Sequence, residues 1–180
     1  MSAKKNSFEL KVMGATILGF AQACINLNII AGSRATSLIS NIKPTSWYPF
    51  QRLRDIESIV LESYEYTAPI MERVGMEMML SWYKFGPGAD IIKRGVEFLK
   101  FQSGSQGYAS VVQGPEELVG SFNLVELDEK NGKALINSTT PFDKNLERGV
   151  IIGGMSAPGD LDYIDVKNDE DRDFFKVEFY

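Results

Sequence analysis

The chain has no histidine and a single cysteine among its 180 residues, and this scarcity excludes much of the usual chemistry of enzymes. Histidine is the commonest general base near neutral pH, a member of the Ser-His-Asp triad and a frequent ligand of zinc and heme. A zinc site would have to be built from carboxylates alone. Cys24 excludes an internal disulfide and, within the apolar run ATILGFAQACINL, is interpreted as a buried, inert thiol in a reducing compartment.

Motifs for phosphate, calcium and acyl-transfer chemistry are also missing. The glycine-rich stretches at 85–89 and 103–107 lack the lysine and the spacing of a phosphate-binding loop. No Gly-x-Ser-x-Gly nucleophile elbow occurs. The spacing of Asp160, Asp162 and Asp165 lacks the glycine that a calcium loop requires. We therefore predict that the chain is not an enzyme and holds no metal, although a small enzyme built on a buried carboxylate pair stays open as a third hypothesis.

The chain also has no excess of positive charge: 19 basic residues stand against 24 acidic ones, for a net charge of −5. A nucleic-acid-binding protein would show a basic face or stripe, so we predict no nucleic-acid partner. The acidity is concentrated in residues 160–180, which hold eight acidic and three basic residues. A solvated face and an acidic docking surface are both consistent with that segment. Apolar residues at 44% and charged residues at 24% indicate a globular chain, and its length predicts one domain over 1–180.

The apolar run at 12–23 raises a question of targeting, because two lysines precede it and Ala-Gln-Ala comes just before Cys24. A cleaved signal peptide is one interpretation. The other is a helix of the fold, since Gln22 and Asn26 continue a polar helical face beyond the supposed cut and residues 8–11 alternate like a strand. The run is shorter than the roughly 20 apolar residues that span a bilayer. We predict a helix, no membrane span and a cytoplasmic location.

The apolar pattern changes period halfway along the chain. Three- and four-residue spacings predict helices over 13–28, 31–42, 50–64, 68–83, 89–101 and 142–155. Alternation predicts strands over 120–127, 134–138, 161–166 and 174–180. Asn131-Gly132 suits the turn of the first hairpin, and a charged turn over 168–173 joins the second. This order predicts an α+β fold, with an N-terminal helical layer packed on a four-stranded antiparallel sheet made of two hairpins joined by a helix.

Aromatic and methionine side chains gather in the middle of the chain. Met78 and Trp82 share a face of the helix at 68–83, and Phe98, Phe101 and Tyr108 follow. Methionine fills irregular gaps and suits adaptable apolar pockets, so this group is consistent with plain core and with the lining of a cavity.

Two further aromatics stand at the start of the third helix, in Trp47-Tyr48-Pro49. One interpretation is that Pro49 sets the start of that helix and Trp47 caps the core. In the other, Trp47 and Tyr48 gate a pocket between the helices and the sheet.

Several short motifs carry a resemblance to a known superfamily. They are Trp47-Tyr48-Pro49 after an early helix, Val74-Gly75 in a later one, Thr140-Pro141-Phe142 before a helix with Gly149, and the closing hairpin FFKVEFY. Over about residues 8–180 the chain resembles the superfamily of the heme nitric oxide/oxygen-binding sensors, the vinyl-reductase-type small-molecule sensor domains and certain vesicle-tethering subunits. It is most similar to a bacterial, myxobacterial heme-free branch.

The departures from the heme-binding members imply a chain without this cofactor. Those proteins hold iron through a histidine before the first hairpin, where residues 103–113 offer Tyr108 and no histidine. Their propionate-binding Tyr-x-Ser-x-Arg signature falls on 136–140, where only Ser138 matches. We expect no cofactor.

The resemblance implies a non-enzymatic sensory or regulatory module that binds a small hydrophobic ligand, or a signalling partner protein, between the helical layer and the sheet. The alternative is a structural adaptor that forms a homodimer and has a filled core. The predicted ligand-binding residues are Trp47, Tyr48, Met78, Trp82, Phe98, Phe101 and Tyr108.

Overall fold

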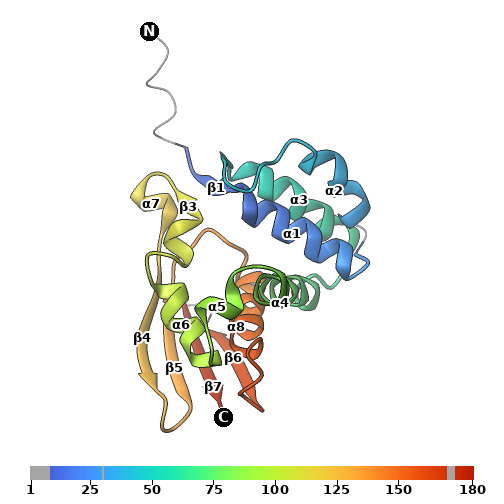
Figure 1. The fold of residues 1–180 in the computed structure, drawn as a ribbon. Coiled ribbons are helices and arrows are strands. Elements are labelled where there is room, and N and C mark those ends of the chain that lie inside the picture. The colour runs from blue at the N-terminus through green and yellow to red at the C-terminus, as the bar shows by residue number, and fades with distance from the viewer. Residues whose placement is uncertain (1–8, 30, 170–172) are drawn as a thin grey trace.

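A computed structural model describes residues 9–29, 31–169 and 173–180. Its N-terminal part is a helical layer, at the top of Figure 1, made of α1 (Gly14–Asn26), α2 (Ala31–Ile39) and α3 (Gln51–Ser63). Beside it lies a small antiparallel sheet in the order β2-β1-β3. Its strands are β1 (Lys11–Met13), β2 (Trp47–Pro49) and β3 (Val112–Gln113).

The C-terminal half forms the predicted four-stranded antiparallel sheet, in the order β4-β5-β7-β6. The strands are β4 (Phe122–Asp128), β5 (Lys133–Ser138), β6 (Ile164–Asp169) and β7 (Phe174–Phe179). β4 pairs with β5 and β6 with β7, and α8 (Lys144–Ser156) connects the two hairpins. The predicted α+β fold is therefore confirmed. Alternation was sufficient here because one face of each strand is buried against α8 and α6.

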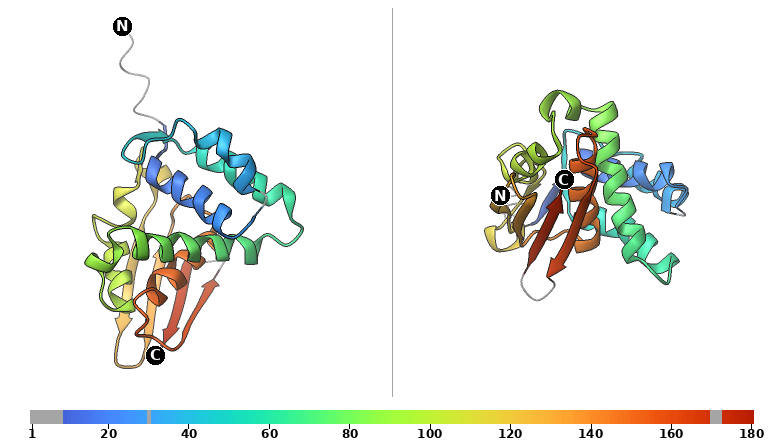
Figure 2. Two further views of the ribbon diagram at one scale, coloured as in Figure 1. Left: turned by 45° about the vertical axis from the view of Figure 1, so that its right-hand side comes forward. Right: turned by 90° about the horizontal axis from the view of Figure 1, so that it is seen from below.

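The long helix α4 (Ala68–Phe85) runs between the helical layer and the sheet (Figure 2). It packs on α8 at backbone contact distance. A Cβ atom at Gly75 would lie 2.1 Å from the carbonyl oxygen of Leu146, and one at Gly149 would lie 1.9 Å from that of Glu72. Only glycine permits this approach, so Val74-Gly75 and Gly149 serve helix packing.

The predicted helix over 89–101 is wrong as a single element. The structure has α5 (Gly88–Ile91) and α6 (Gly95–Ser103), separated by an extended backbone at Ile92 and Arg94. The carboxylate of Glu97 accepts the backbone N–H groups of Lys93 (2.7 Å) and Arg94 (3.2 Å), which starts a new helix.

Other boundaries shift by a few residues. The last helix starts after Asp143, whose carboxylate accepts two backbone N–H groups as the N-cap. The third strand of the large sheet begins at Ile164 rather than at 161. The predicted turn at 168–173 and the predicted strand at 8–11 each lie partly outside the described residues. The pattern did not predict β2, β3, the short helix α7 (Glu116–Val119) or the 3-10 turn η1 (Tyr108–Ser110), because segments of two to four residues carry no measurable period.

The apolar run at 12–23 is built into the core, where Ile17, Phe20 and Cys24 of α1 are fully buried. Burial raises the pKa of the Cys24 thiol to about 12, so the thiolate form needed for reactivity is suppressed. Within the described residues no helix has both the length and the apolar character to cross a membrane.

A candidate ligand-binding cavity

A cavity of about 290 Å³ lies between α1, α4, α6 and the start of α8. An engineered cavity of ~150 Å³ in another protein holds benzene, so this one has room for about a dozen non-hydrogen atoms. Most of its wall is apolar. The lining residues are Ala15, Thr16, Gly19, Met78, Met79, Trp82, Phe101, Gln102, Gln106, Gly107, Ser110, Val111, Phe142, Leu146, Glu147 and Val150.

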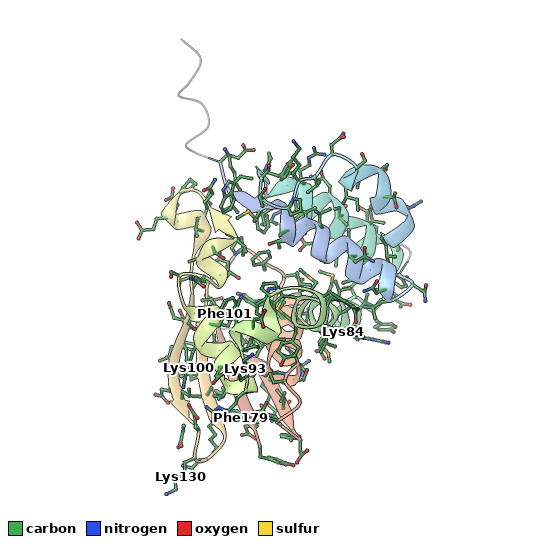
Figure 3. The ribbon with its side chains drawn as sticks, viewed as in Figure 1. Lys84, Lys93, Lys100, Phe101, Lys130 and Phe179 are labelled. Atoms are coloured by element: carbon green, nitrogen blue, oxygen red, sulfur yellow. The ribbon has the colours of Figure 1, made fainter. Side chains whose placement is uncertain are left out.

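One wall is aromatic. The rings of Trp82 on α4 and Phe101 on α6 stack with centroids 5.2 Å apart and planes 26° apart. Phe101 is labelled in Figure 3, on the helix in front of the large sheet. Met78 and Met79 continue this wall one turn earlier on α4. Flexible thioethers beside flat rings can adjust to the shape of an apolar guest.

Glu147 of α8 is also a lining residue, and its side chain, almost wholly hidden from solvent, forms a buried polar network with three residues that do not line the cavity. Its Oε1 accepts the Thr140 hydroxyl at 2.8 Å, and the Ser138 hydroxyl lies 2.7 Å from both carboxyl oxygens. The Lys144 ammonium lies 3.2 Å from Oε2 and donates to the Ser138 carbonyl at 2.9 Å. This network ties the last residue of β5 to the first turn of α8.

The position of the Phe142 wall is set by the helical layer and by η1. The Phe142 ring lies 5.4 Å from the ring of Phe50 and 6.0 Å from that of Tyr108, centroid to centroid. Immediately after it, Asp143 caps α8 by accepting the N–H groups of Asn145 and Leu146 at 2.9 Å. Phe142 therefore contacts the cavity on one side and the N-terminal part of the fold on the other.

Three of the predicted site residues, Met78, Trp82 and Phe101, line this cavity. Two others lie in the core. Phe98 packs under Gly154, where a Cβ atom would come within 2.5 Å of its ring. The hydroxyl of Tyr108 donates to the Val119 carbonyl.

The remaining two predicted residues, Trp47 and Tyr48, belong to β2, which pairs with β1 through Met13 and Val12. The Tyr48 hydroxyl accepts the Lys43 N–H at 2.8 Å and donates to the Asn41 carbonyl at 3.2 Å. The structure places both aromatics in the small sheet rather than at the cavity.

The sequence interpretation missed Glu147. A signal was available, because Glu147 shares a helical face with Val150, Ile151 and Gly154 at spacings of three, four and seven. A lone carboxylate on such a face is costly to bury unless it is paired. The prediction that the sheet forms one wall is also wrong, since α8 lies between the sheet and the cavity.

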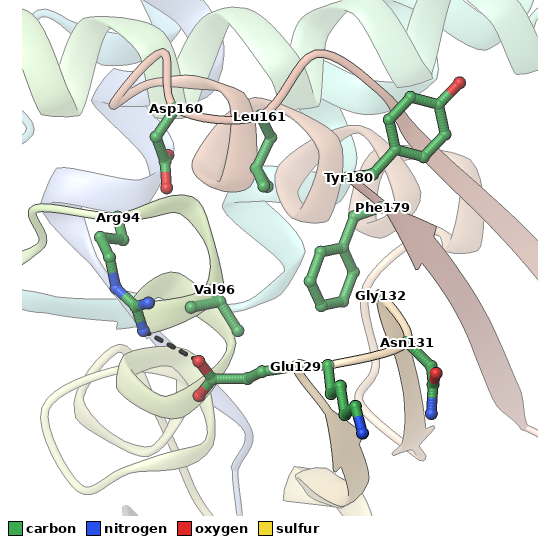
Figure 4. A pocket seen from close by; sticks show the side chains of 10 residues that line it. Arg94, Val96, Glu129, Asn131, Gly132, Asp160, Leu161, Phe179 and Tyr180 are labelled. Carbon is green, nitrogen blue, oxygen red and sulfur yellow. Dashed lines mark hydrogen bonds and ion pairs between the residues drawn. The ribbon is translucent and has the colours of Figure 1, made fainter.

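A second hollow, of about 330 Å³, lies where α6 begins, beside the turn between β4 and β5 (Figure 4). Three of its charged side chains, those of Arg94, Glu129 and Asp160, are engaged in ion pairs or hydrogen bonds. Arg94 lies 3.0 Å from Glu129, which also accepts Lys100 at 2.7 Å. The Gly95 N–H donates to Asp160 at 2.8 Å. We interpret this hollow as a structural junction.

The cavity offers few groups that could ligate a metal. No histidine, cysteine or tyrosine is among its lining residues. Burial, followed by the nearby carboxylate of Glu147, raises the pKa of the Tyr108 phenol, which disfavours the phenolate that would bind iron. Within the part of the chain that the structure describes, no cluster of three or more cysteine, aspartate and glutamate residues is placed to hold a metal ion.

No protein-family model and no curated protein sequence matches the chain. Solved structures do resemble it. An oxygen-binding H-NOX domain related to soluble guanylate cyclases aligns with a TM-score of 0.65 at 14% identity, over 93% of this chain and 95% of that one. An H-NOX protein from S. oneidensis in the Fe(II) ligation state aligns with a TM-score of 0.67 at 10% identity, over 93% and 96%. These likenesses show that the chain has an H-NOX-like α+β fold.

Proposed function

We propose that this chain is a non-enzymatic sensory or regulatory module that binds a small, mainly apolar ligand without heme. The observation that carries the proposal is the cavity of about 290 Å³ between α1, α4, α6 and α8, with its stacked Trp82 and Phe101 wall. The structural neighbours support a sensor, because they are H-NOX domains and one is described as oxygen binding.

The proposal that heme is absent rests on the donor set. The chain has no histidine, and the tyrosine and cysteine that could replace it, Tyr108 and Cys24, are buried away from the cavity. Ser138, the single match to the propionate-binding signature, has its hydroxyl engaged by Glu147, and Thr140 stands where that signature has arginine. The cavity has room for about a dozen non-hydrogen atoms, far fewer than a porphyrin has.

The proposal that the chain is not an enzyme is supported by the hydrogen bonds of Glu147. Glu147 is the single carboxylate among the residues that line the cavity, and its oxygens are bonded to Ser138, Thr140 and Lys144. General acid–base catalysis needs a group free to exchange a proton with substrate. One domain, a cytoplasmic location, a myxobacterial origin, a homodimer and a signalling partner remain predictions.

The structural adaptor with a filled core is the alternative function. A core in which Trp82 and Phe101 interdigitated with their neighbours would favour it. The void beside these two rings weighs against it.

The test is whether an apolar probe binds in this cavity. A Cβ atom at Gly19 would meet only the Met78 methyl carbon, at 3.7 Å, so Gly19→Leu should place its side chain in the void. Ala68→Leu adds bulk at an exposed position on α4 and is the control. We expect benzofuran to bind the wild-type protein and the Ala68→Leu variant in ligand-observed NMR, and not to bind the Gly19→Leu variant.

Native mass spectrometry of the purified wild-type protein adds a second measurement, because it reports any retained small molecule together with the oligomeric state. Failure of benzofuran to bind the wild-type protein, or equal binding by Gly19→Leu, would overturn the proposal and favour the adaptor.

A further inference from the structure

We infer that Met78 determines how large a ligand the cavity admits, because its side chain reaches from α4 across to α1 opposite Gly19. This inference rests on the proposed function and adds a residue that determines the size of the ligand. It follows from one contact between two helices and from the difference between this side chain and the rings that line the same cavity.

The contact joins the end of the Met78 side chain to a helix that offers no side chain of its own there. A Cβ atom at Gly19 would lie 3.7 Å from the Met78 methyl carbon, an ordinary van der Waals distance. Among the described residues, no other atom beyond the adjacent backbone of α1 would come within 4 Å of it. Both residues line the cavity, and Met78 is 9% exposed. The end of Met78 therefore forms the boundary of the cavity between α4 and α1.

The aromatic residues that line the cavity are held by other rings. Trp82 stacks on Phe101 at 5.2 Å between centroids, and Phe142 meets the ring of Tyr108 edge-on. Moving any of these rings loses an aromatic contact that adds to the stability gained from burial. Met78, by contrast, is unbranched and turns about three side-chain bonds, so it gives way before the rings do. The limit on ligand size thus lies at Met78.

Truncation of Met78 should enlarge the cavity in a defined direction. In Met78→Ala the Cγ, Sδ and Cε atoms are absent, and the space that they fill next to Gly19 joins the cavity. The surroundings of a truncated side chain relax only in part, so most of that space stays open. A larger guest can then place about three further non-hydrogen atoms between α4 and α1.

Benzofuran and dibenzofuran measure this change. The two molecules share the furan oxygen, and dibenzofuran has one more fused ring, which takes it beyond the dozen or so non-hydrogen atoms for which the cavity has room. We expect the ratio of the affinities for dibenzofuran and benzofuran to rise at least about tenfold in Met78→Ala, in isothermal titration calorimetry. A misfit of one methylene group in an apolar pocket already gives about that factor. The ratio removes any effect of the substitution that is common to both probes.

Met76→Ala and Met79→Ala are the matched controls on α4. Met76 is partly buried and does not line the cavity, so its variant should keep the wild-type ratio. Met79 does line the cavity, but its truncation leaves the contact between Met78 and Gly19 in place and should raise the ratio less than Met78→Ala does.

A measurement that needs no variant is the nuclear Overhauser contact between benzofuran and the Met78 ε-methyl group in the wild-type protein, which we expect to observe. An unchanged ratio in Met78→Ala, a larger rise in Met79→Ala, or absence of this contact would overturn the inference. The proposed function would stand in each of these cases, because benzofuran still binds. If neither probe binds the wild-type protein, both fall.

Discussion

Two regions beside α4 are packed in opposite ways: its contact with α8 and the cavity. At the contact with α8 the backbones touch, and Cβ atoms at Gly75, Gly149 and Gly153 would come within 1.9–2.6 Å of carbonyl oxygens of the other helix. At the cavity, Met78, Met79 and Trp82 of α4 border a void of about 290 Å³. Backbone contact leaves nothing that can rearrange, whereas long, flexible side chains at the cavity can adjust to a guest. The helix contact thus holds α4 and α8 in place, while the cavity is free to bind.

The sharpest test of this comparison is to add one methyl group at the α4–α8 contact and one at the cavity. Gly149→Ala would place a Cβ atom 1.9 Å from the Glu72 carbonyl oxygen, where only a backbone shift relieves the clash. We expect a loss of at least about 3 kcal/mol in the free energy of unfolding, or failure to fold. Gly19→Ala on the cavity side has a nearest contact of 3.7 Å and should be neutral or stabilising by up to ~1 kcal/mol.

Denaturant unfolding of the two variants measures this difference. Similar stability changes for Gly149→Ala and Gly19→Ala would show that the α4–α8 contact is not as close as described.

A second prediction concerns the start of α8, where Glu57 of α3 is buried and its Oε1 has no hydrogen-bond partner among the described residues. Burial, and then the negative charge of Asp143, raises the pKa of Glu57 from 4.5 to about 7, against an opposing effect of Arg54. The folded state therefore holds the proton more tightly than the unfolded state. The stabilising effect is complete below about pH 4.5 and is lost as the pH rises to about 7, by on the order of 3 kcal/mol.

Glu57→Gln should remove this dependence. Relative to the wild-type protein, the variant should gain about 3 kcal/mol in the free energy of unfolding between pH 4.5 and pH 8. Chemical denaturation over this pH range measures the gain, and Glu62→Gln, exposed on the same helix, should show none. A constant difference between Glu57→Gln and the wild-type protein would contradict the prediction.

A smaller effect separates two methionines of α4. Met71 is 1% exposed in the core, and Met71→Ala should cost about 2–5 kcal/mol, as core truncations do. Met78 lines the cavity and already lacks neighbours on that side, so Met78→Ala should cost less than about 2 kcal/mol. Urea unfolding of both variants provides the comparison. A full core penalty at Met78 would indicate that the void closes in solution.

The smallest expected effect belongs to Tyr108, whose ring contacts Phe142 but whose hydroxyl donates to Val119. Tyr108→Phe should cost about 1 kcal/mol, the usual net value of one hydrogen bond. The wild-type protein and this variant should both stay colourless after incubation with hemin. A stoichiometric, sharp Soret band that disappears on Tyr108→Phe would show that iron binds this tyrosine.

Much of the architecture could be predicted because its elements have a clear period. The strands of both large hairpins alternate, since one face meets α8 and α6 and the other meets solvent. The helix at 68–83 was predicted within two residues of α4. The division between α5 and α6 could not be predicted, because the apolar spacing continues through Ile92 while a side chain–backbone contact of Glu97 interrupts the helix.

The candidate site could be predicted only in part. Met78, Trp82 and Phe101 were chosen as bulky, adaptable side chains on helical faces, and they line the cavity. Phe98 and Tyr108 meet the same description and lie in the core. The five residues have equal standing in sequence, because composition and periodicity say that a side chain faces inward but not whether an atom lies opposite it.

The sequence by itself determined the absence of histidine chemistry, the α+β order of elements and the apolar faces of helices and strands, because residue type and period act locally. Tertiary structure alone decided where the void lies and which groups border it. The volume between α1, α4, α6 and α8 depends on how closely Gly75 and Gly149 bring two helices together. The polar network of Glu147 depends on three donors that come from the end of β5, the connection after it and the first turn of α8. Contacts between residues that are far apart in the sequence leave no periodic pattern from which they could be predicted.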